Sequence, residues 1–177
     1  EGVYTAVITP FERNRLDFIS LTRIVEQQVA AGIDGIVVCG TTGESATLSN
    51  DEIVEVTRLV SVVSAGACKV IAGIGKNSTH HSIELLNRIR EVDVDGLLVI
   101  TPYYNKPSQA GLLAHFNAIA TSASDLPIML YTVPSRTGVQ LDVETFKSLC
   151  SVRNIVALKD ATADLARSAE YVSAARE

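Results

Sequence analysis

Short apolar strands recur along this chain at nearly regular intervals. Apolar runs begin at Ile36, Val70, Leu97, Ile128 and Ile155, so that successive starts lie 27 to 34 residues apart. This interval is the length of a unit made of one strand and one helix. Runs that are apolar throughout are typical of parallel strands covered by helices on both faces. The repetition therefore predicts an α/β protein whose parallel sheet is either a closed barrel or an open, doubly wound sheet.

Polar segments follow almost every predicted strand, and this distribution favours the barrel. These segments are Gly40–Ser45, Gly73–Asn77, Thr101–Pro107 and Thr132–Gly138. A (β/α)8 TIM barrel builds its site from the loops that follow many different strands. An open sheet uses mainly the loops beside one crevice. We therefore predict the (β/α)8 TIM barrel.

The number of strands is smaller than a closed barrel requires. With a first strand at Val3–Ile8 the chain contains six βα units, whereas a barrel has eight in about 250 residues. We predict that residues 1–177 form a partial TIM-barrel domain from which the last two βα units are absent. Because six strands leave two unpaired edges, we expect residues 1–177 alone to be inactive and prone to aggregation.

Composition excludes several classes of function. Fifteen basic and 20 acidic residues give a net charge of −5, whereas nucleic-acid binders carry a basic face. No apolar run approaches the roughly 18 residues of a membrane span, and the N-terminus has no charged segment followed by an apolar leader. We therefore expect a cytoplasmic protein that binds neither nucleic acid nor a membrane.

The cysteines and histidines do not follow a metal-binding pattern. Cys39, Cys68 and Cys150 lack metal-site spacing, and we predict that they are buried free thiols of a reducing cytosol. The pair His80–His81 does not form a ligand cluster with His115, because neighbouring residues on a helix point about 100° apart. We expect no metal.

A lysine suited to nucleophilic chemistry ends the apolar run Ile155–Lys159. Alternation along a strand places Ile155, Ala157 and Lys159 on one side of the sheet. An amine held away from water loses part of its preference for the charged form, and a neutral lysine attacks carbonyl carbon. The alternative is a strand-end lysine that pairs with the adjacent Asp160.

The loop Gly40–Ser45 contains groups suited to a small carboxylate. Thr41 and Thr42 offer hydroxyl and N–H donors, although the same residues are also compatible with simple turn formation. Neither a P-loop nor a strict dinucleotide-binding pattern is present at Gly73–Asn77. The sequence therefore gives no indication of a nucleotide cofactor.

Phenol and guanidinium groups follow two further strands. Tyr103–Tyr104 and Tyr131 are able to relay protons to an imine, or else to pack at the rim of the sheet. Arg136 offers a planar fork for a carboxylate, or is a solvated loop arginine. Together with Lys159 on the same rim of an acidic protein, these residues favour an anionic oxo-acid substrate.

Four segments of the chain resemble the dihydrodipicolinate synthase family, in order and at matching spacing. They are Gly40–Ser45, Thr101–Pro107, Tyr131–Gly138 and Leu158–Ala161. The resemblance extends over essentially all 177 residues. It implies a (β/α)8 barrel with a C-terminal helical extension, absent from this chain, and usually a homotetramer. The implied reaction is the condensation of pyruvate with aspartate-β-semialdehyde in lysine and diaminopimelate biosynthesis.

The resemblance also implies a role for each matching residue. Lys159 forms a Schiff base with pyruvate. Tyr131 is the general acid and base, which relays protons through Thr41 to Tyr104, and Tyr104 reaches in from the neighbouring subunit. No metal or organic cofactor is needed, because the imine on Lys159 serves as the electron sink.

The remaining implied roles concern substrate binding. Thr42 holds the pyruvate carboxylate through its hydroxyl and N–H groups, and Gly43 in the same loop is also assigned to substrate binding. Arg136 binds the carboxylate of the semialdehyde at the entrance.

Three positions depart from the family pattern. Thr132 stands where the family usually has Asn, next to Tyr131. His81 and Asn50 stand where lysine-inhibited members often carry Glu and His, whereas Asn77 matches. Loss of a carboxylate at position 81 removes a partner for an ammonium group, so lysine feedback is left open.

Two alternative functions are left open by the sequence. A sister pyruvate aldolase, such as N-acetylneuraminate lyase or a keto-deoxy-sugar acid aldolase, uses the same lysine and tyrosine but generally lacks the arginine found here at Arg136. The second alternative is a truncated, non-catalytic barrel fragment that acts as a subunit or binding module.

Overall fold

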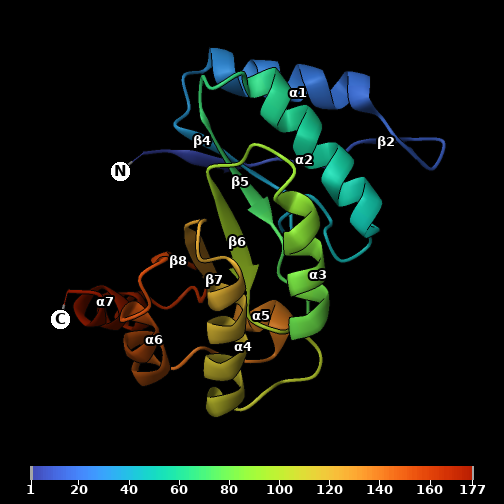
Figure 1. Cartoon of the computed structure of the whole chain (residues 1–177). Coiled ribbons are helices and arrows are strands. Elements are labelled where there is room, and N and C mark those ends of the chain that lie inside the picture. Colours follow the sequence, from blue (N-terminus) through green and yellow to red (C-terminus); the bar gives the residue numbers. More distant parts are fainter. Residues whose placement is uncertain (1, 177) are drawn as a thin grey trace. The chain divides into compact units, whose positions relative to one another are not determined.

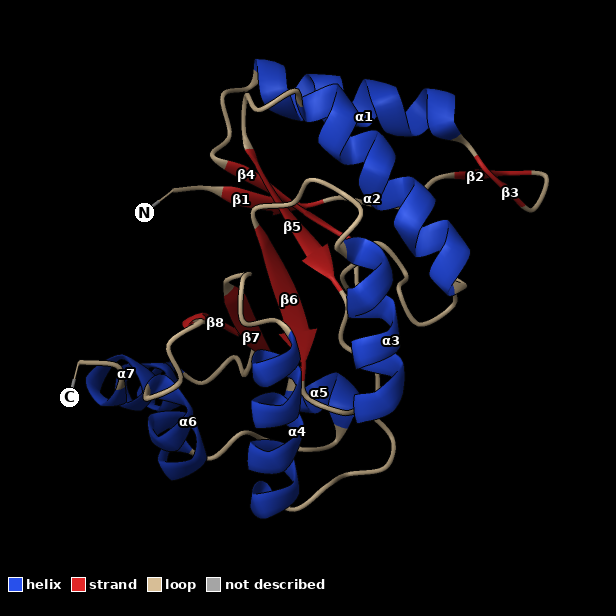
Figure 2. Ribbon diagram, viewed as in Figure 1, coloured by secondary structure: helices blue, strands red, loops and turns tan. Residues whose placement is uncertain are grey.

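The computed structural model describes residues 2–176 (Figures 1 and 2). The strands are β1 (Tyr4–Ala6), β2 (Phe11–Glu12), β3 (Arg15–Leu16), β4 (Gly35–Val38), β5 (Lys69–Gly73), β6 (Gly96–Ile100), β7 (Ile128–Thr132) and β8 (Ile155–Asp160). The helices are α1 (Phe18–Ala30), α2 (Asn50–Ser64), α3 (Thr79–Ile89), α4 (Gln109–Ser122), α5 (Pro134–Thr137), α6 (Val143–Cys150) and α7 (Leu165–Ala174).

The chain divides into two compact units. The first contains the described residues up to Ile74 together with Leu85–Leu97, and the second contains Gly75–Glu84 together with the residues from Leu98 onward. Within each unit the strands of the sheet lie in chain order, β1-β4-β5 in the first, and residues 98–100 of β6 followed by β7 and β8 in the second. Chain-order neighbours are what successive βα units produce.

The first unit is a three-stranded parallel layer with helices packed on it. β1 pairs with β4, and β4 pairs with β5, with Ile36 opposite Val70. All four residues of β4 are buried. Helices α1 and α2 lie side by side over these strands (Figure 2). Strands β2 and β3 form a separate antiparallel hairpin.

Local capping explains where the helices of the two units begin. Ser49 and Glu52 form the reciprocal capping box at α2 that the sequence predicts. Asp17 caps α1 and Ser108 caps α4 through their side chains, which accept backbone N–H groups. Asp142 stands at the N-cap of α6, but its side chain makes no capping hydrogen bond.

A short repeated motif, Asp-Gly before an apolar strand, has a defined structural role in the first unit. The carboxylate of Asp34 accepts the backbone N–H of Val3 at 2.6 Å. The carboxylate of Asp95 accepts the N–H of Val70 at 2.8 Å and lies 3.4 Å from the Lys69 ammonium. In both cases the carboxylate satisfies an N–H group at the start of an earlier strand, which would otherwise lack a partner.

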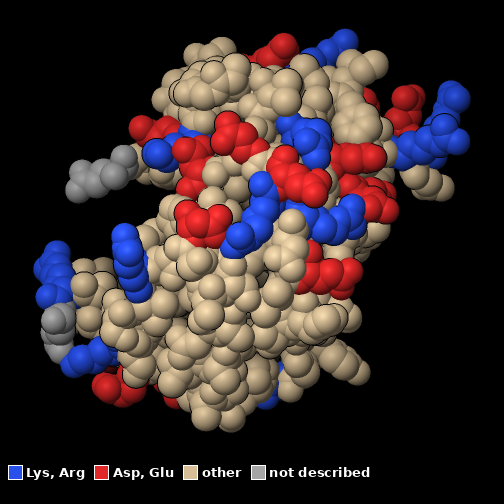
Figure 3. Space-filling view, in the orientation of Figure 1, with Lys and Arg blue, Asp and Glu red and all other residues tan. Residues whose placement is uncertain are grey.

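The surface carries charges of both signs. On the face shown in Figure 3, acidic and basic side chains are interspersed, and the surface over α4 is uncharged, as the sequence of α4 requires. None of the described helices combines the length and the apolar character that a membrane span needs. Within residues 2–176, no group of three or more His, Cys, Asp or Glu side chains is arranged to hold a metal ion.

We predict that Asp95→Ala lowers the free energy of unfolding by about 1 to 3 kcal/mol, because the buried N–H of Val70 loses its acceptor. Urea denaturation followed by circular dichroism measures the change. Asp93→Ala is the matched control, since Asp93 is an exposed carboxylate two residues away. An equal effect of the two substitutions would contradict the assigned role of Asp95.

Candidate active site

Lys159 and Tyr131 lie opposite each other on the paired strands β8 and β7 of the second unit. The Lys159 Nζ atom is 4.4 Å from the centroid of the Tyr131 ring, within the range of a cation–π contact. Tyr131 is buried and Lys159 is half-buried. Burial lowers the pKa of Lys159 below its ordinary value, which increases the fraction of neutral, nucleophilic amine.

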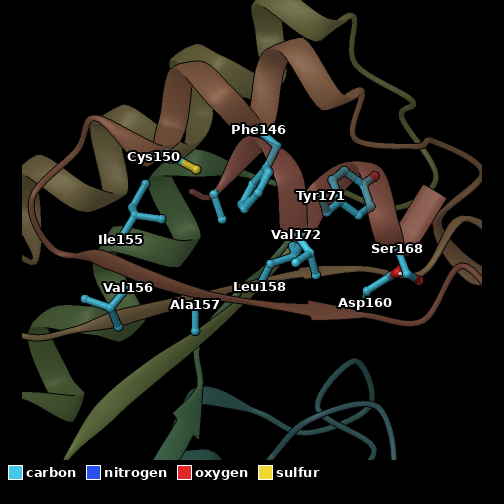
Figure 4. Close-up of a pocket in the computed structure, with 11 residues that line it drawn as sticks. Phe146, Cys150, Ile155, Val156, Ala157, Leu158, Asp160, Ser168, Tyr171 and Val172 are labelled. Atoms are coloured by element: carbon cyan, nitrogen blue, oxygen red, sulfur yellow. Dashed lines mark hydrogen bonds between the residues drawn. The ribbon is translucent and has the colours of Figure 1, made fainter. Parts of the chain in front are cut away.

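The carboxylate of Asp160 is held away from Lys159. It accepts a hydrogen bond from the Ser168 hydroxyl and another from the Thr162 N–H at 2.9 Å. Burial alone would raise the pKa of Asp160, but these hydrogen bonds outweigh it and lower the pKa. Asp160 and Ser168 meet at one end of the pocket shown in Figure 4. This arrangement disfavours the alternative in which Lys159 pairs with Asp160.

An irregularity in the pairing of β7 with β8 determines which side chains share a side. Ile128 lies opposite Ile155, but Met129 lies opposite Ala157, so Val156 is an extra residue in β8. Figure 4 shows Ile155 pointing into the pocket and Ala157 pointing away from it. The prediction that Ile155 and Lys159 share a side is therefore wrong. It assumed that side chains alternate regularly along β8, and the extra residue Val156 interrupts this alternation.

The pocket in Figure 4 is a mainly apolar cavity of about 390 Å³ on the side of β8 that faces α6 and α7. Its lining includes Phe146, Leu158, Tyr171 and Cys150, and does not include Lys159. Cys150 is exposed, so its predicted burial is wrong, whereas Cys39 and Cys68 are buried free thiols as predicted. The α6 position of Cys150 follows the last core residue of that helix, and its side chain is therefore left at the surface.

Arg136 lies on α5, a single helical turn that follows β7. The turn begins with Pro134 and ends at Gly138, whose φ of 71° is a left-handed conformation that favours glycine. The Gly138 N–H donates to the Pro134 carbonyl at 2.9 Å. The guanidinium of Arg136 is exposed, and the structure therefore presents it to solvent on a well-defined turn.

Tyr104 is carried by the loop after β6. Its side chain is 89 % exposed and its φ is 74°. The loop begins at Thr101, whose N–H donates to the Tyr131 carbonyl at 2.9 Å. Further along, the side-chain amide of Asn105 donates to the Asn77 carbonyl at 3.0 Å. The backbone that carries Tyr104 is thus fixed on both sides, while its phenol is free to contact another molecule.

Thr41, Thr42 and Gly43 follow β4 and belong to the first unit. Thr41 is half-buried, Thr42 is exposed and Gly43 is buried. The Thr9 hydroxyl donates to the Gly43 carbonyl at 2.7 Å. A Cβ atom at position 43 would lie 3.1 Å from both the Cys39 nitrogen and the Val7 carbonyl oxygen. Close approach of the backbone therefore explains the glycine, and the loop presents Thr42 at the surface.

The structure thus brings Lys159 together with Tyr131 and places Arg136 and Tyr104 on loops of the same unit. The loop after β4, which carries Thr41, Thr42 and Gly43, belongs to the first unit. Their functional roles stay predictions.

One buried polar group near the site was not expected from the sequence. Thr132 is fully buried, and its hydroxyl has no hydrogen-bond partner within residues 2–176. Its position next to Tyr131, and its departure from the family's usual Asn, were visible in the sequence. The missing partner was not, because it depends on packing.

This fold and site define a class of parallel α/β proteins that carry a lysine near the C-terminal end of a strand, here Lys159 on β8. The model of the dihydrodipicolinate synthetase family matches residues 1–177. The chain belongs to that family.

Individual relatives agree with this assignment. The 4-hydroxy-tetrahydrodipicolinate synthase of Magnetococcus marinus is 50 % identical over 170 residues, which are 96 % of this chain and 58 % of that protein. The solved structure of the synthase from Methylacidiphilum fumariolicum SolV has a TM-score of 0.94 and 46 % identity, covering 98 % of this chain and 58 % of that one.

A third relative is the dihydrodipicolinate synthase of Acinetobacter baumannii, solved in complex with pyruvate. It has a TM-score of 0.95 and 41 % identity, covering 99 % of this chain and 60 % of that one. These likenesses confirm the predicted (β/α)8 barrel class with six βα units in this chain. The chain spans about 58 % of the length of the curated relatives that it matches.

We predict that Thr132→Val leaves the free energy of unfolding unchanged or raises it by up to about 1 kcal/mol. Valine has nearly the same shape and removes a buried hydroxyl that has no partner. Chemical denaturation measures the change, and Thr132→Ala, which also removes a methyl group, is expected to destabilise by about 1 kcal/mol. A loss of more than about 1 kcal/mol in the valine variant would mean that the hydroxyl is bonded after all.

Proposed function

We propose that this chain carries the Schiff-base lysine of a 4-hydroxy-tetrahydrodipicolinate synthase, which condenses pyruvate with aspartate-β-semialdehyde. The observation that carries the proposal is the half-buried amine of Lys159, whose pKa is lowered by burial and which lies over the Tyr131 ring. Family membership supports it, as do the names of the relatives, one of which was solved with pyruvate.

The first step proposed is imine formation at Lys159. The neutral amine attacks the keto carbon of pyruvate, and loss of water leaves a C=N bond in place of the C=O bond. Because Asp160 is held by Ser168 and Thr162, no adjacent carboxylate stabilises the ammonium form. The amine is therefore available as a nucleophile.

The second step is carbon–carbon bond formation. The imine withdraws electrons, so the methyl group of the bound pyruvate loses a proton and the imine becomes an enamine. The former methyl carbon of this enamine then attacks the aldehyde carbon of the semialdehyde. Tyr131 is the proposed acid and base, with Thr41 and Tyr104 as the further members of the proton relay. Tyr131 is buried next to the amine, where a phenol can transfer a proton with little competition from water.

Substrate carboxylates are proposed to bind at two loops. Thr42, with Gly43 beside it, binds the carboxylate of pyruvate, and Arg136 binds that of the semialdehyde. Arg136 also favours the synthase over the sister aldolases, which generally lack this arginine. No metal or organic cofactor takes part in the proposed reaction, since the imine supplies the electron sink.

The complete protein is proposed to be a cytoplasmic homotetramer in which Tyr104 completes the site of a neighbouring subunit. The high exposure of the Tyr104 phenol, 89 %, fits a residue whose partner lies on another chain. Lysine biosynthesis, to which the names of the relatives point, is the proposed pathway.

We predict that borohydride reduction in the presence of pyruvate attaches one pyruvyl group to the protein, at Lys159. Mass spectrometry of the intact protein and of its peptides reads out the adduct. Lys159→Arg is expected to abolish it, because a guanidinium does not form the imine, whereas Lys147→Arg on α6 serves as the control that retains it. Adduct formation at another lysine would overturn the assignment.

We predict that Tyr131→Phe in the complete protein lowers the turnover of pyruvate and aspartate-β-semialdehyde by about 100-fold or more, because the proton relay loses its central hydroxyl. Steady-state kinetics measures turnover, and reductive trapping shows that the amine is still in place. Tyr103→Phe removes a phenol that the mechanism does not use and is the matched control. Turnover equal to that of the unmodified protein would exclude the proposed role of Tyr131.

A further inference from the structure

The side chain of Lys106 lies across Gly138, at the end of the turn that carries Arg136. A Cβ atom at position 138 would lie 2.6 Å from Lys106 Cε and 3.5 Å from its Nζ atom. The outer half of the lysine therefore covers the glycine Cα, where any larger residue would collide with it. The contact joins the loop after β6 to the turn after β7 within the second unit.

The same two segments are also joined on their buried side. The Thr101 hydroxyl lies 3.4 Å from the hydroxyl of Thr137, and the Thr137 hydroxyl in turn lies 2.9 Å from the carbonyl of Val139. Both Thr101 and Thr137 are buried. The loop is thus attached to the turn near its beginning, at Thr101, and near its end, at Lys106. The segment that carries Lys106 is therefore attached to the turn that carries Arg136.

The charge of Lys106 is not neutralised by the protein. Within the part of the chain that the structure describes, its ammonium takes part in no ion pair or hydrogen bond. The side chain is exposed, although the protein as a whole carries a net charge of −5. The Lys106 ammonium has no carboxylate partner, and it lies against Gly138, which follows Arg136 by two positions in the chain. Two cations on neighbouring segments create a positive potential that suits an anion.

The backbone of this loop is held in a costly conformation at the same place. Tyr104 and Lys106 have φ values of 74° and 45°, in the left-handed region that glycine adopts more easily. Residues held in this region are strained, and such strain is concentrated at functional sites. Both residues present exposed side chains, which is consistent with a functional requirement for these side chains rather than for the bend alone.

We propose that Lys106 is a further binding residue for the carboxylate of the second substrate and acts together with Arg136. The guanidinium supplies a planar pair of donors, and the ammonium supplies a second, mobile donor from the neighbouring loop. The inference rests on the proposed function, because it assigns specificity for an anionic aldehyde at that same site.

The test is made in the complete protein and compares Lys106→Met with the unmodified form in steady-state assays with pyruvate and aspartate-β-semialdehyde. Methionine retains an apolar stem over Gly138 and removes the charge. We expect the KM for the semialdehyde to rise about three- to tenfold, in the range of an exposed charge-assisted contact. The KM for pyruvate and the yield of the borohydride adduct are expected to stay unchanged. Lys106→Arg, which restores a charge, is expected to recover most of the affinity.

Two further readouts separate a charge effect from a structural one. Added salt should raise the semialdehyde KM of the unmodified protein more than that of Lys106→Met, since screening weakens only the charged contact. Lys147→Met on α6 is the control for loss of a lysine elsewhere. An unchanged semialdehyde KM in Lys106→Met would overturn the proposal. A variant in which the KM values for both substrates rise equally and the adduct yield falls would also overturn it. If the unmodified protein itself formed no pyruvyl adduct, the proposed function would fail instead.

Discussion

The pairing of β7 with β8 is the interaction on which the candidate chemistry depends. Side chains of paired residues in a parallel sheet point to the same side, so the register decides whether Tyr131 and Lys159 meet. If Val156 paired with Met129 in simple register instead of being the extra residue, Tyr131 would lie opposite Leu158, and Lys159 would lie opposite Thr132. The irregularity therefore brings the phenol and the amine to one side of the sheet, and it leaves Leu158 for the apolar pocket.

The cations of this unit differ in solvent exposure, and their proposed roles differ accordingly. Lys159 is half-buried and has a lowered pKa, which suits a nucleophile. Arg136 and Lys106 are exposed, so that an anion in solution can reach their guanidinium and ammonium groups. The carboxylate of Asp160 would favour the ammonium form of Lys159, and its hydrogen bonds to Ser168 and Thr162 remove it from that role.

The sequence predicted most of the fold because its signals are local and repeated. Apolar runs define the strands, and the capping box at Ser49 marks the start of α2 to the residue. The register irregularity at Val156 was not predictable, because an extra residue in a strand leaves the apolar pattern almost unchanged. The contact of Lys106 with Gly138 was also invisible, since it joins loops more than 30 residues apart, and only packing brings them together. Cys150 was misjudged for a related reason: apolar neighbours in sequence do not decide which face of a helix a residue occupies.

A glycine in close contact with surrounding atoms lies in each of two loops that carry candidate residues. Gly43 is confined by backbone atoms of Cys39 and Val7, and it is held by the Thr9 hydroxyl. Gly138 is confined by the side chain of Lys106. In each case a glycine permits a close approach next to a candidate binding residue, Thr42 in one loop and Arg136 in the other. Under the proposed function, a substitution at either glycine would displace such a residue without removing it, and its effect would fall on substrate affinity before it fell on the proposed chemistry of Lys159.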